Sequence, residues 1–318
     1  MTARIALLLL CSVAVAACGS DESGDPGGAP FASRAGALRE IGQLAWLRID
    51  ERVLFGARNG DARFIIALGA PAPSDCESGT VSVQEGVKAR SFEYYAKTGE
   101  FRYLRSQFSD CTPPGNAGES VIRGILERGE EAEHDPTNVS DSFDQYAVYG
   151  DEALGSGYAQ TLVLKDAGGT VTAETTEELL GSVEWRDADI GRVAGSVLTR
   201  RLVRNVPDAH SLEWRQGRAD EPLYVDAGLG QSLSVEGPYA WNSSSCSADS
   251  GFRRITAGIA RDDDGYPSGG QLTIVAGSES FTATFDAGGN AVVSFSNGNT
   301  VTLDAGEVRA ALDQPACW

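Results

Sequence analysis

Hydrophobic and polar positions alternate in short runs along most of this chain, which is the pattern of half-buried β-strands. Residues 280–286 form the clearest run, because three apolar side chains alternate there with two threonines. Runs of the same kind, separated by short glycine-containing turns, cover about residues 252–260, 271–276, 290–296 and 299–304. Together these runs predict an antiparallel meander over residues 252–304.

A short helix is expected directly after the meander. Asp304 is followed three residues later by Glu307, which is the signature of a capping box at the start of a helix. The capping box precedes the segment Val308–Leu312, which we predict to be helical.

Strands are also expected before the meander. Asn59-Gly60 predicts a tight hairpin turn, because these residues accept the positive φ angles that such turns require. Residues 158–165 and 170–176 are expected to be paired strands. The segment SVEWR at 182–186 returns as SLEWR at 211–215, and we interpret the two copies as strands that each bury a tryptophan.

Two segments on either side of residue 112 are less regular. Residues 90–108 predict a hairpin around residues 97–99, with Phe92 opposite Leu104 and Tyr95 opposite Phe101. The spacing of the apolar residues in 119–132 predicts a short helix.

The sequence TPPGN at residues 112–116 indicates a boundary between two units. We expect an N-terminal β-rich unit over 31–112 and a C-terminal β-rich domain over 113–318. The predicted fold class is mainly β, with antiparallel meanders or sandwich-like sheets and one or two short helices.

The first residues carry a targeting signal. Arg4 is followed by an apolar stretch over residues 5–17, which is too short to span a bilayer and is typical of a signal peptide. The residues Val15-Ala16-Ala17-Cys18 resemble the lipobox of bacterial lipoproteins.

This resemblance implies removal of residues 1–17 and attachment of acyl chains, such as palmitate, to Cys18, which anchors the protein to a membrane. Residues 18–30 are rich in Gly, Ser, Asp and Pro and would form a flexible tether. By similarity to enteric lipoproteins, Gly19 favours the outer membrane; which face of that membrane carries the protein stays open.

Four cysteines lie outside the signal peptide and the lipidated Cys18, and an even number in an exported chain suggests disulfide bonds. Four cysteines allow three pairings, and buried free thiols are the alternative. We favour the local pairs Cys76–Cys111 and Cys246–Cys317, because each pair brackets one expected structural unit.

Charge excludes one class of partner. The chain of 318 residues has a net charge of −19, so nucleic acid would be repelled. A P-loop, a G-x-S-x-G elbow and an H-E-x-x-H motif do not occur in the sequence. Its two histidines, His134 and His210, are the candidates for a general base, and surface histidines are the simpler interpretation.

Asp262-Asp263-Asp264-Gly265 is the strongest candidate metal site, with Asp262 and Asp264 as calcium ligands. The alternation of a calcium loop is incomplete there, so a solvated polar turn is the alternative. No other cofactor is expected. Aromatic side chains that could form a sugar-binding platform are Tyr94, Tyr95, Tyr103 and Trp241, although core packing is the competing role.

Three hypotheses about function follow. The first is a non-catalytic binding or envelope-assembly lipoprotein whose partner is a protein or a surface polymer. The second is a hydrolase of extracellular polymers that uses carboxylates or His210. The third is a calcium-dependent adhesion module.

Overall fold

The structure, a computed structural model, describes residues 31–49, 52–53, 73–92, 97–114, 120–133, 143–151, 155–188, 191–228, 232–246 and 251–314. These residues form one antiparallel sheet of 15 strands, a separate pair of very short strands and two short α-helices. The mainly β fold class predicted from the sequence is confirmed. Residues 1–30, which carry the expected signal peptide, lipobox and tether, lie outside the described residues, as does Asn59-Gly60.

The elements have the following bounds: α1 Arg34–Gln43, 3-10 helix η2 Leu44–Trp46, β1 Arg48–Ile49, β2 Arg52–Val53, β3 Ser78–Phe92, β4 Lys97–Thr112, β5 Ser120–Glu131, β6 Phe143–Tyr149, β7 Tyr158–Lys165, β8 Val171–Ala188, β9 Gly191–Val206, β10 His210–Gln216, β11 Leu223–Gly228, β12 Ser232–Ser243, β13 Arg253–Arg261, β14 Pro267–Ala276, β15 Glu279–Phe285, β16 Ala291–Phe295, β17 Thr300–Leu303 and α2 Ala305–Asp313.

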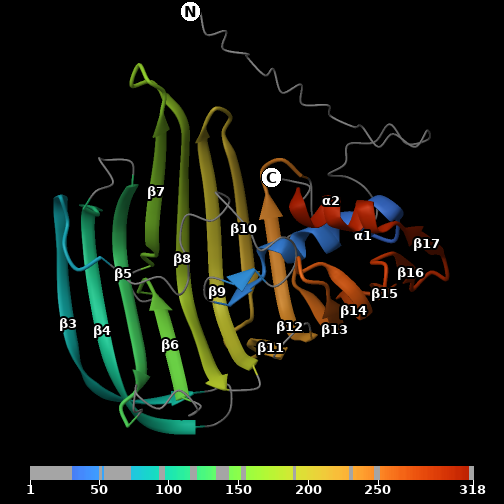
Figure 1. Ribbon diagram of the computed structural model, residues 1–318, viewed down its shortest axis with the longest axis horizontal. Coiled ribbons are helices and arrows are strands. Elements are labelled where there is room, and N and C mark those ends of the chain that lie inside the picture. The colour runs from blue at the N-terminus through green and yellow to red at the C-terminus, as the bar shows by residue number, and fades with distance from the viewer. Residues whose placement is uncertain are drawn as a thin grey trace, which may run out of the picture.

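The strands follow one another across the sheet almost in chain order, from β3 at one edge to β17 at the other (Figure 1). At two places a pair of short strands lies end to end: β6 and β7 between β5 and β8, and β10 and β11 between β9 and β12. Glycines with positive φ follow β6 and β10, at Gly150 and Gly217. A Cβ atom at Gly217 would lie 2.0 Å from the carbonyl oxygen of Ser196, so only glycine fits there.

One face of the sheet is buried under the helices. Residues that pair across successive strands share a face, and one such row is buried throughout: Trp185, Ala194, Val225, Val235, Ala257, Leu272, Ala283 and Val293. Helices α1 and α2 lie against the β12–β17 part of the sheet (Figure 1), and their apolar side chains join the same core. We call this side the core face and the other side the outer face.

Several sequence predictions are confirmed. Strands β13 to β17 form the meander, and α2 follows it with both hydrogen bonds of the Asp304–Glu307 capping box. Segments 182–186 and 211–215 are strands, and Trp185 and Trp214 are buried.

Residues 120–131 form strand β5, so the predicted helix over 119–132 is wrong. The strand pairs with β4 on one side and with β6 and β7 on the other. Its alternation is interrupted at Gly124, where φ is +89° beside a break in the β4 register, and this irregularity hides the strand period. The pairing of β5 with β4 also places the strands on either side of residues 112–116 in one sheet.

The predicted register of the hairpin over 90–108 is wrong as well. Phe101 pairs with Lys88 and Leu104 pairs with Glu85, so residues 97–99 belong to β4 instead of forming the turn. Helix α1 was not expected from the sequence, and the apolar residues that follow it form η2 and the short strand β1.

A buried carboxylate on α1 joins the helix to the sheet. Glu40 is completely buried, and its Oε2 lies 2.9 Å from Nε of Arg253 on β13. The same oxygen accepts hydrogen bonds from the Tyr239 hydroxyl at 3.3 Å and from the Trp241 indole at 3.2 Å, both on β12. Burial, reinforced by the negative charge of Glu40, raises the pKa of Tyr239 well above its usual value.

We expect Glu40→Gln to lower the free energy of unfolding by about 3–5 kcal/mol, because Arg253 keeps its buried charge and loses its counterion. Urea denaturation measures the change. The matched control is Glu236→Gln, which removes an Arg254 ion pair of 3.1 Å whose carboxylate is 60% exposed, and should cost less than about 1 kcal/mol. Equal losses in the two variants would contradict this account of how α1 is held.

Candidate functional site

The ends of β3 and β4 curl beneath the sheet (Figure 1). Arg90 on β3 shows the extent of this bend, because its Nη2 lies 3.0 Å from Oε1 of Glu184 on β8. Strands β4, β5 and β6 separate β3 from β8 in the sheet order, so a flat sheet would hold these two residues far apart. The hairpin therefore folds over the outer face of the strands beside it.

A small second core lies within the bend, on the outer face. Phe101 and Tyr146 are fully buried there, with their ring centroids 5.8 Å apart. Gly129 makes room for this contact, because a Cβ at that position would lie 2.2 Å from the Tyr146 ring. The Arg90 guanidinium lies 4.1 Å from the centroid of the same ring, and the Lys88 ammonium lies 5.7 Å from it.

A buried carboxylate, Glu127, organises the polar groups next to this core. It is 4% exposed, contacts the Lys88 ammonium and accepts a 3.0 Å hydrogen bond from the Tyr146 hydroxyl. Burial and the charge of Glu127 both raise the pKa of Tyr146. These interactions fix β3 and β4 against β5 and β6.

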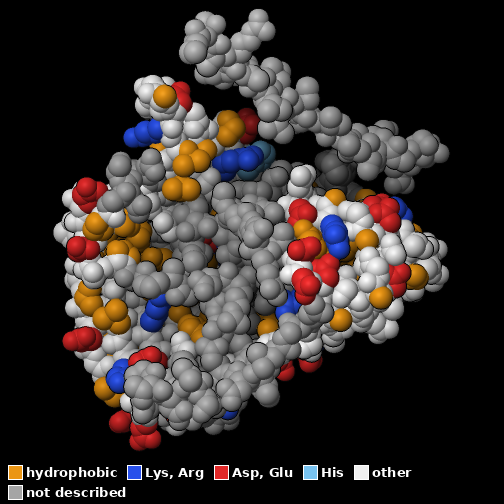
Figure 2. All heavy atoms as spheres, in the orientation of Figure 1, with side chains coloured by type: hydrophobic (Ala, Val, Ile, Leu, Met, Phe, Trp, Pro, Cys, Tyr) orange, Lys and Arg blue, Asp and Glu red, His pale blue; other side chains and the backbone are white. Residues whose placement is uncertain are grey.

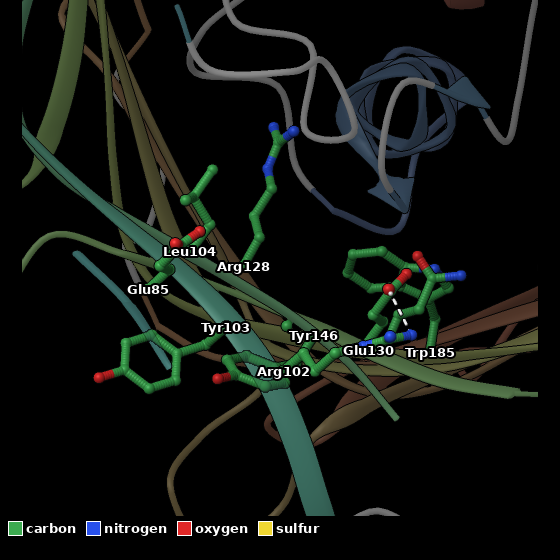
Figure 3. Close-up of a pocket in the computed structure, with 10 residues that line it drawn as sticks. Glu85, Arg102, Tyr103, Leu104, Arg128, Glu130, Tyr146 and Trp185 are labelled. Atoms are coloured by element: carbon green, nitrogen blue, oxygen red, sulfur yellow. Dashed lines mark hydrogen bonds and ion pairs between the residues drawn. The ribbon is translucent and has the colours of Figure 1, made fainter. Parts of the chain in front are cut away.

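The same strands carry a pocket of about 360 Å³ at the point where β4 bends, and we call it the bend pocket. It is lined by Glu85, Arg102, Tyr103, Leu104, Arg128, Gly129, Glu130, Gln145, Tyr146 and Trp185. In Figure 3, Arg128 and Leu104 extend to one side of the strands, whereas Tyr103 and Tyr146 extend to the other. The first side is the core face, because Leu104 and Arg128 share a row with the buried Ala147 and Val183.

The wall of the pocket is aromatic at one end and charged along its length. Arg102, Glu130, Gln145 and Trp185 succeed one another across β4, β5, β6 and β8. Arg102 and Glu130 form an ion pair of 3.1 Å, and both side chains are nearly half exposed. Leu104 is 43% exposed, so an apolar side chain is accessible beside these groups.

Arg128 connects the pocket to a buried polar network on the core face. Its guanidinium is hydrogen-bonded to the buried Tyr149 and interacts with Tyr158. Further along the core face, Glu177 and Arg200 form a fully buried ion pair. Burial raises the pKa of Tyr149, and it raises that of Tyr158 to about 12.

Among the described residues, the predicted general base and the predicted calcium turn lie at the ends of different strands of the sheet. His210 is half-buried at the start of β10, opposite Arg204, whereas His134 lies outside the described residues. Asp262 accepts from the backbone of Asp264 and Tyr266 through Oδ1 and binds Arg309 through Oδ2 at 2.8 Å.

Among the described residues there is no group of three or more His, Cys, Asp or Glu side chains placed to hold a metal ion. The Asp264 side chain is exposed, and both oxygens of Asp262 have partners within the protein. Calcium binding at this turn stays a prediction, and it would have to displace Arg309 to use Asp262 fully.

The disulfide between Cys76 and Cys111 is confirmed, with a Cα–Cα distance of 5.3 Å. It ties the residues before β3 to the end of β4. Cys246 is also disulfide-bonded. Cys317 and Cys18 lie outside the described residues, so the pairing of Cys246 with Cys317 and the lipidation of Cys18 stay predictions.

The expected sugar platform is divided by the fold. Tyr103 lines the bend pocket, but Trp241 is completely buried against Glu40, and Tyr94 and Tyr95 lie outside the described residues. Trp185 was marked in the sequence by the repeated SVEWR motif, yet only as a core anchor. The charged residues of the pocket carried no signal, because they lie on three different strands and become neighbours only when β3, β4 and β5 pair.

Comparison with protein-family models, curated proteins and solved structures finds no match to this chain. In the part of the chain that the structure describes, no helix has the length and apolar character needed to cross a membrane.

The buried tyrosines predict a loss of stability in alkali. Folding raises the pKa of Tyr158 from 10.0 to about 12, so the unfolded chain loses this proton at a lower pH than the native protein does. The contribution of Tyr158 to the free energy of unfolding is therefore complete below pH 10 and is lost as the pH rises toward 12. Replacement by Phe should reduce this decline by up to about 1.4 kcal/mol per pH unit. Urea unfolding at a series of pH values measures it.

Between pH 7 and 9 Tyr158 keeps its proton in both the native and the unfolded protein. In this range the free energy of unfolding should therefore depend on pH in the same way in Tyr158→Phe and in the unchanged protein. An alkaline decline that is identical in the two proteins would rule out the assigned role of Tyr158.

Proposed function

We propose that this protein is an exported lipoprotein, held at the bacterial cell envelope through acylated Cys18, that binds a ligand non-catalytically in the bend pocket. The outer membrane is the proposed location, and the partner is a surface polymer or another envelope component. The lipobox and the tether support the location.

The bend pocket is the single observation that carries the binding role. Its volume lies at the lower end of the roughly 300–1,000 Å³ that ligand sites occupy, and it combines apolar and aromatic side chains with convergent polar groups. Its wall is built on strands that the Arg90–Glu184 and Lys88–Glu127 ion pairs hold in place, so the site is preformed.

The groups in the pocket do not form a catalytic set of the usual kind. Arg102 is paired with Glu130, and His210 is not among the described residues that line the pocket. A glycosidase needs two carboxyl groups of which one keeps its proton near neutral pH, usually through burial in an apolar site. Glu130 is nearly half exposed and paired with Arg102, so both groups are accessible for hydrogen bonds to a ligand.

Photo-crosslinking in the native cells tests the binding role. A benzophenone side chain at Leu104 should give a defined adduct, whereas the same group at Val292 should not. The two positions are matched, because Leu104 is 43% exposed in the pocket and Val292 is 47% exposed on the outer face of the meander. An identical pattern of adducts at both positions, or none at either, would contradict a binding role for the pocket.

Intact-mass analysis of the mature protein tests the anchor. We expect a chain that begins at Cys18 and carries the added mass of several acyl chains, and a Cys18→Ser variant that is neither acylated nor retained in the membrane fraction. A mature protein with an unmodified Cys18 thiol would refute the proposed anchor, and it would leave the role of the pocket open to its own test.

A further inference from the structure

From the chemistry of the bend pocket we infer that its ligand is a neutral saccharide, of about one or two sugar rings at a time. This inference rests on the proposed binding function and specifies the class of ligand. It follows from the charge balance of the pocket, the charge of its surroundings and the arrangement of its apolar groups.

The charges that line the pocket cancel. Two arginines, Arg102 and Arg128, face two glutamates, Glu85 and Glu130, and one arginine and one glutamate are already joined at 3.1 Å. A site for an anion or a cation carries an excess of the opposite charge. Balanced guanidinium and carboxylate groups instead offer both donors and acceptors, which hydroxyl groups can satisfy together.

The surroundings disfavour an anionic ligand. The chain has a net charge of −19. Acidic side chains lie along the edge formed by β3 and β4 and over α2 on the face shown in Figure 2. Such a field lowers the local concentration of phosphorylated or carboxylated polymers and of fatty acids.

The apolar groups are separated from one another by polar ones. Trp185 lies at one end of the pocket beside the Arg102–Glu130 ion pair, and Leu104 lies at the opposite end (Figure 3). Gln145 pairs between Glu130 and Trp185 in the sheet and adds an amide. An acyl chain needs a continuous apolar channel, whereas a sugar ring presents C–H groups to an aromatic side chain and hydroxyl groups to planar polar side chains.

Calorimetric titration and saturation-transfer NMR of the mature protein test the inference. The probes are neutral trisaccharides of glucose, mannose and N-acetylglucosamine, with trigalacturonate and oleate as the anionic sugar and the anionic amphiphile. We expect at least one neutral trisaccharide to bind, and the two anionic probes to bind at least tenfold more weakly.

Two pocket variants locate the binding. Gln145→Ala and Glu130→Ala should each weaken binding of the neutral sugar at least tenfold, because the sugar hydroxyl groups lose a hydrogen-bond partner. Gln271→Ala, on the exposed side of β14, is the matched control and should leave binding unchanged. Urea denaturation of each variant establishes that the fold is retained.

The outcomes separate this inference from the proposed function. Binding of oleate or trigalacturonate in place of the neutral sugars, with the same loss in the pocket variants, would overturn the inference and leave the binding function standing. Failure of every probe, with a specific adduct at Leu104, would also overturn it in favour of a protein ligand. Failure of every probe together with no Leu104-specific adduct would overturn both.

Discussion

The contact between Glu40 and Arg253 positions the helical layer that covers the core face of the sheet. An open sheet of this width needs such a layer, because one of its faces is apolar. Strand residues such as Leu272 and Val293 bury their side chains on that face only if a second layer lies on it. The layer is small, consisting of α1, η2 and α2 within the described residues. A buried ion pair and two further hydrogen bonds to one carboxylate oxygen give that small layer one defined position.

The two faces of the sheet have different roles at its two ends. Over β12–β17 the core face is apolar and lies beneath the helices, and the outer face is exposed. Around β3–β6 the hairpin folds over the outer face and buries Tyr146 and Phe101 there. On the core face of these strands, charged and apolar side chains stay accessible, and they line the bend pocket.

The parts of the fold that the sequence predicted are those in which neighbouring residues carry the information. The meander was predictable because its alternation is strict and its turns contain glycine or Asn-Gly. Strand β3 lacks that signal, since Val83 and Val87 point to an exposed surface and the residues between them are polar. Helix α1 buries Arg39 and Glu40, so its sequence does not have the polar and apolar sides of an ordinary surface helix. Arg90 and Glu184 meet only through tertiary folding, so the bend of the β3–β4 hairpin carried no local pattern.

The order of the strands has a consequence for how the chain folds. Most neighbouring strands are joined by short connections, so much of the sheet can form by successive closure of short loops. The docking of α1 is different, because Glu40 and Tyr239 are 199 residues apart in the chain. That step closes a long loop, and the partners of Glu40 are in place only after β12 and β13 have formed. Helix α1 is therefore synthesised before the strands it covers but is among the last elements to reach its place, and until then the apolar core face of the meander is open to solvent and to other chains.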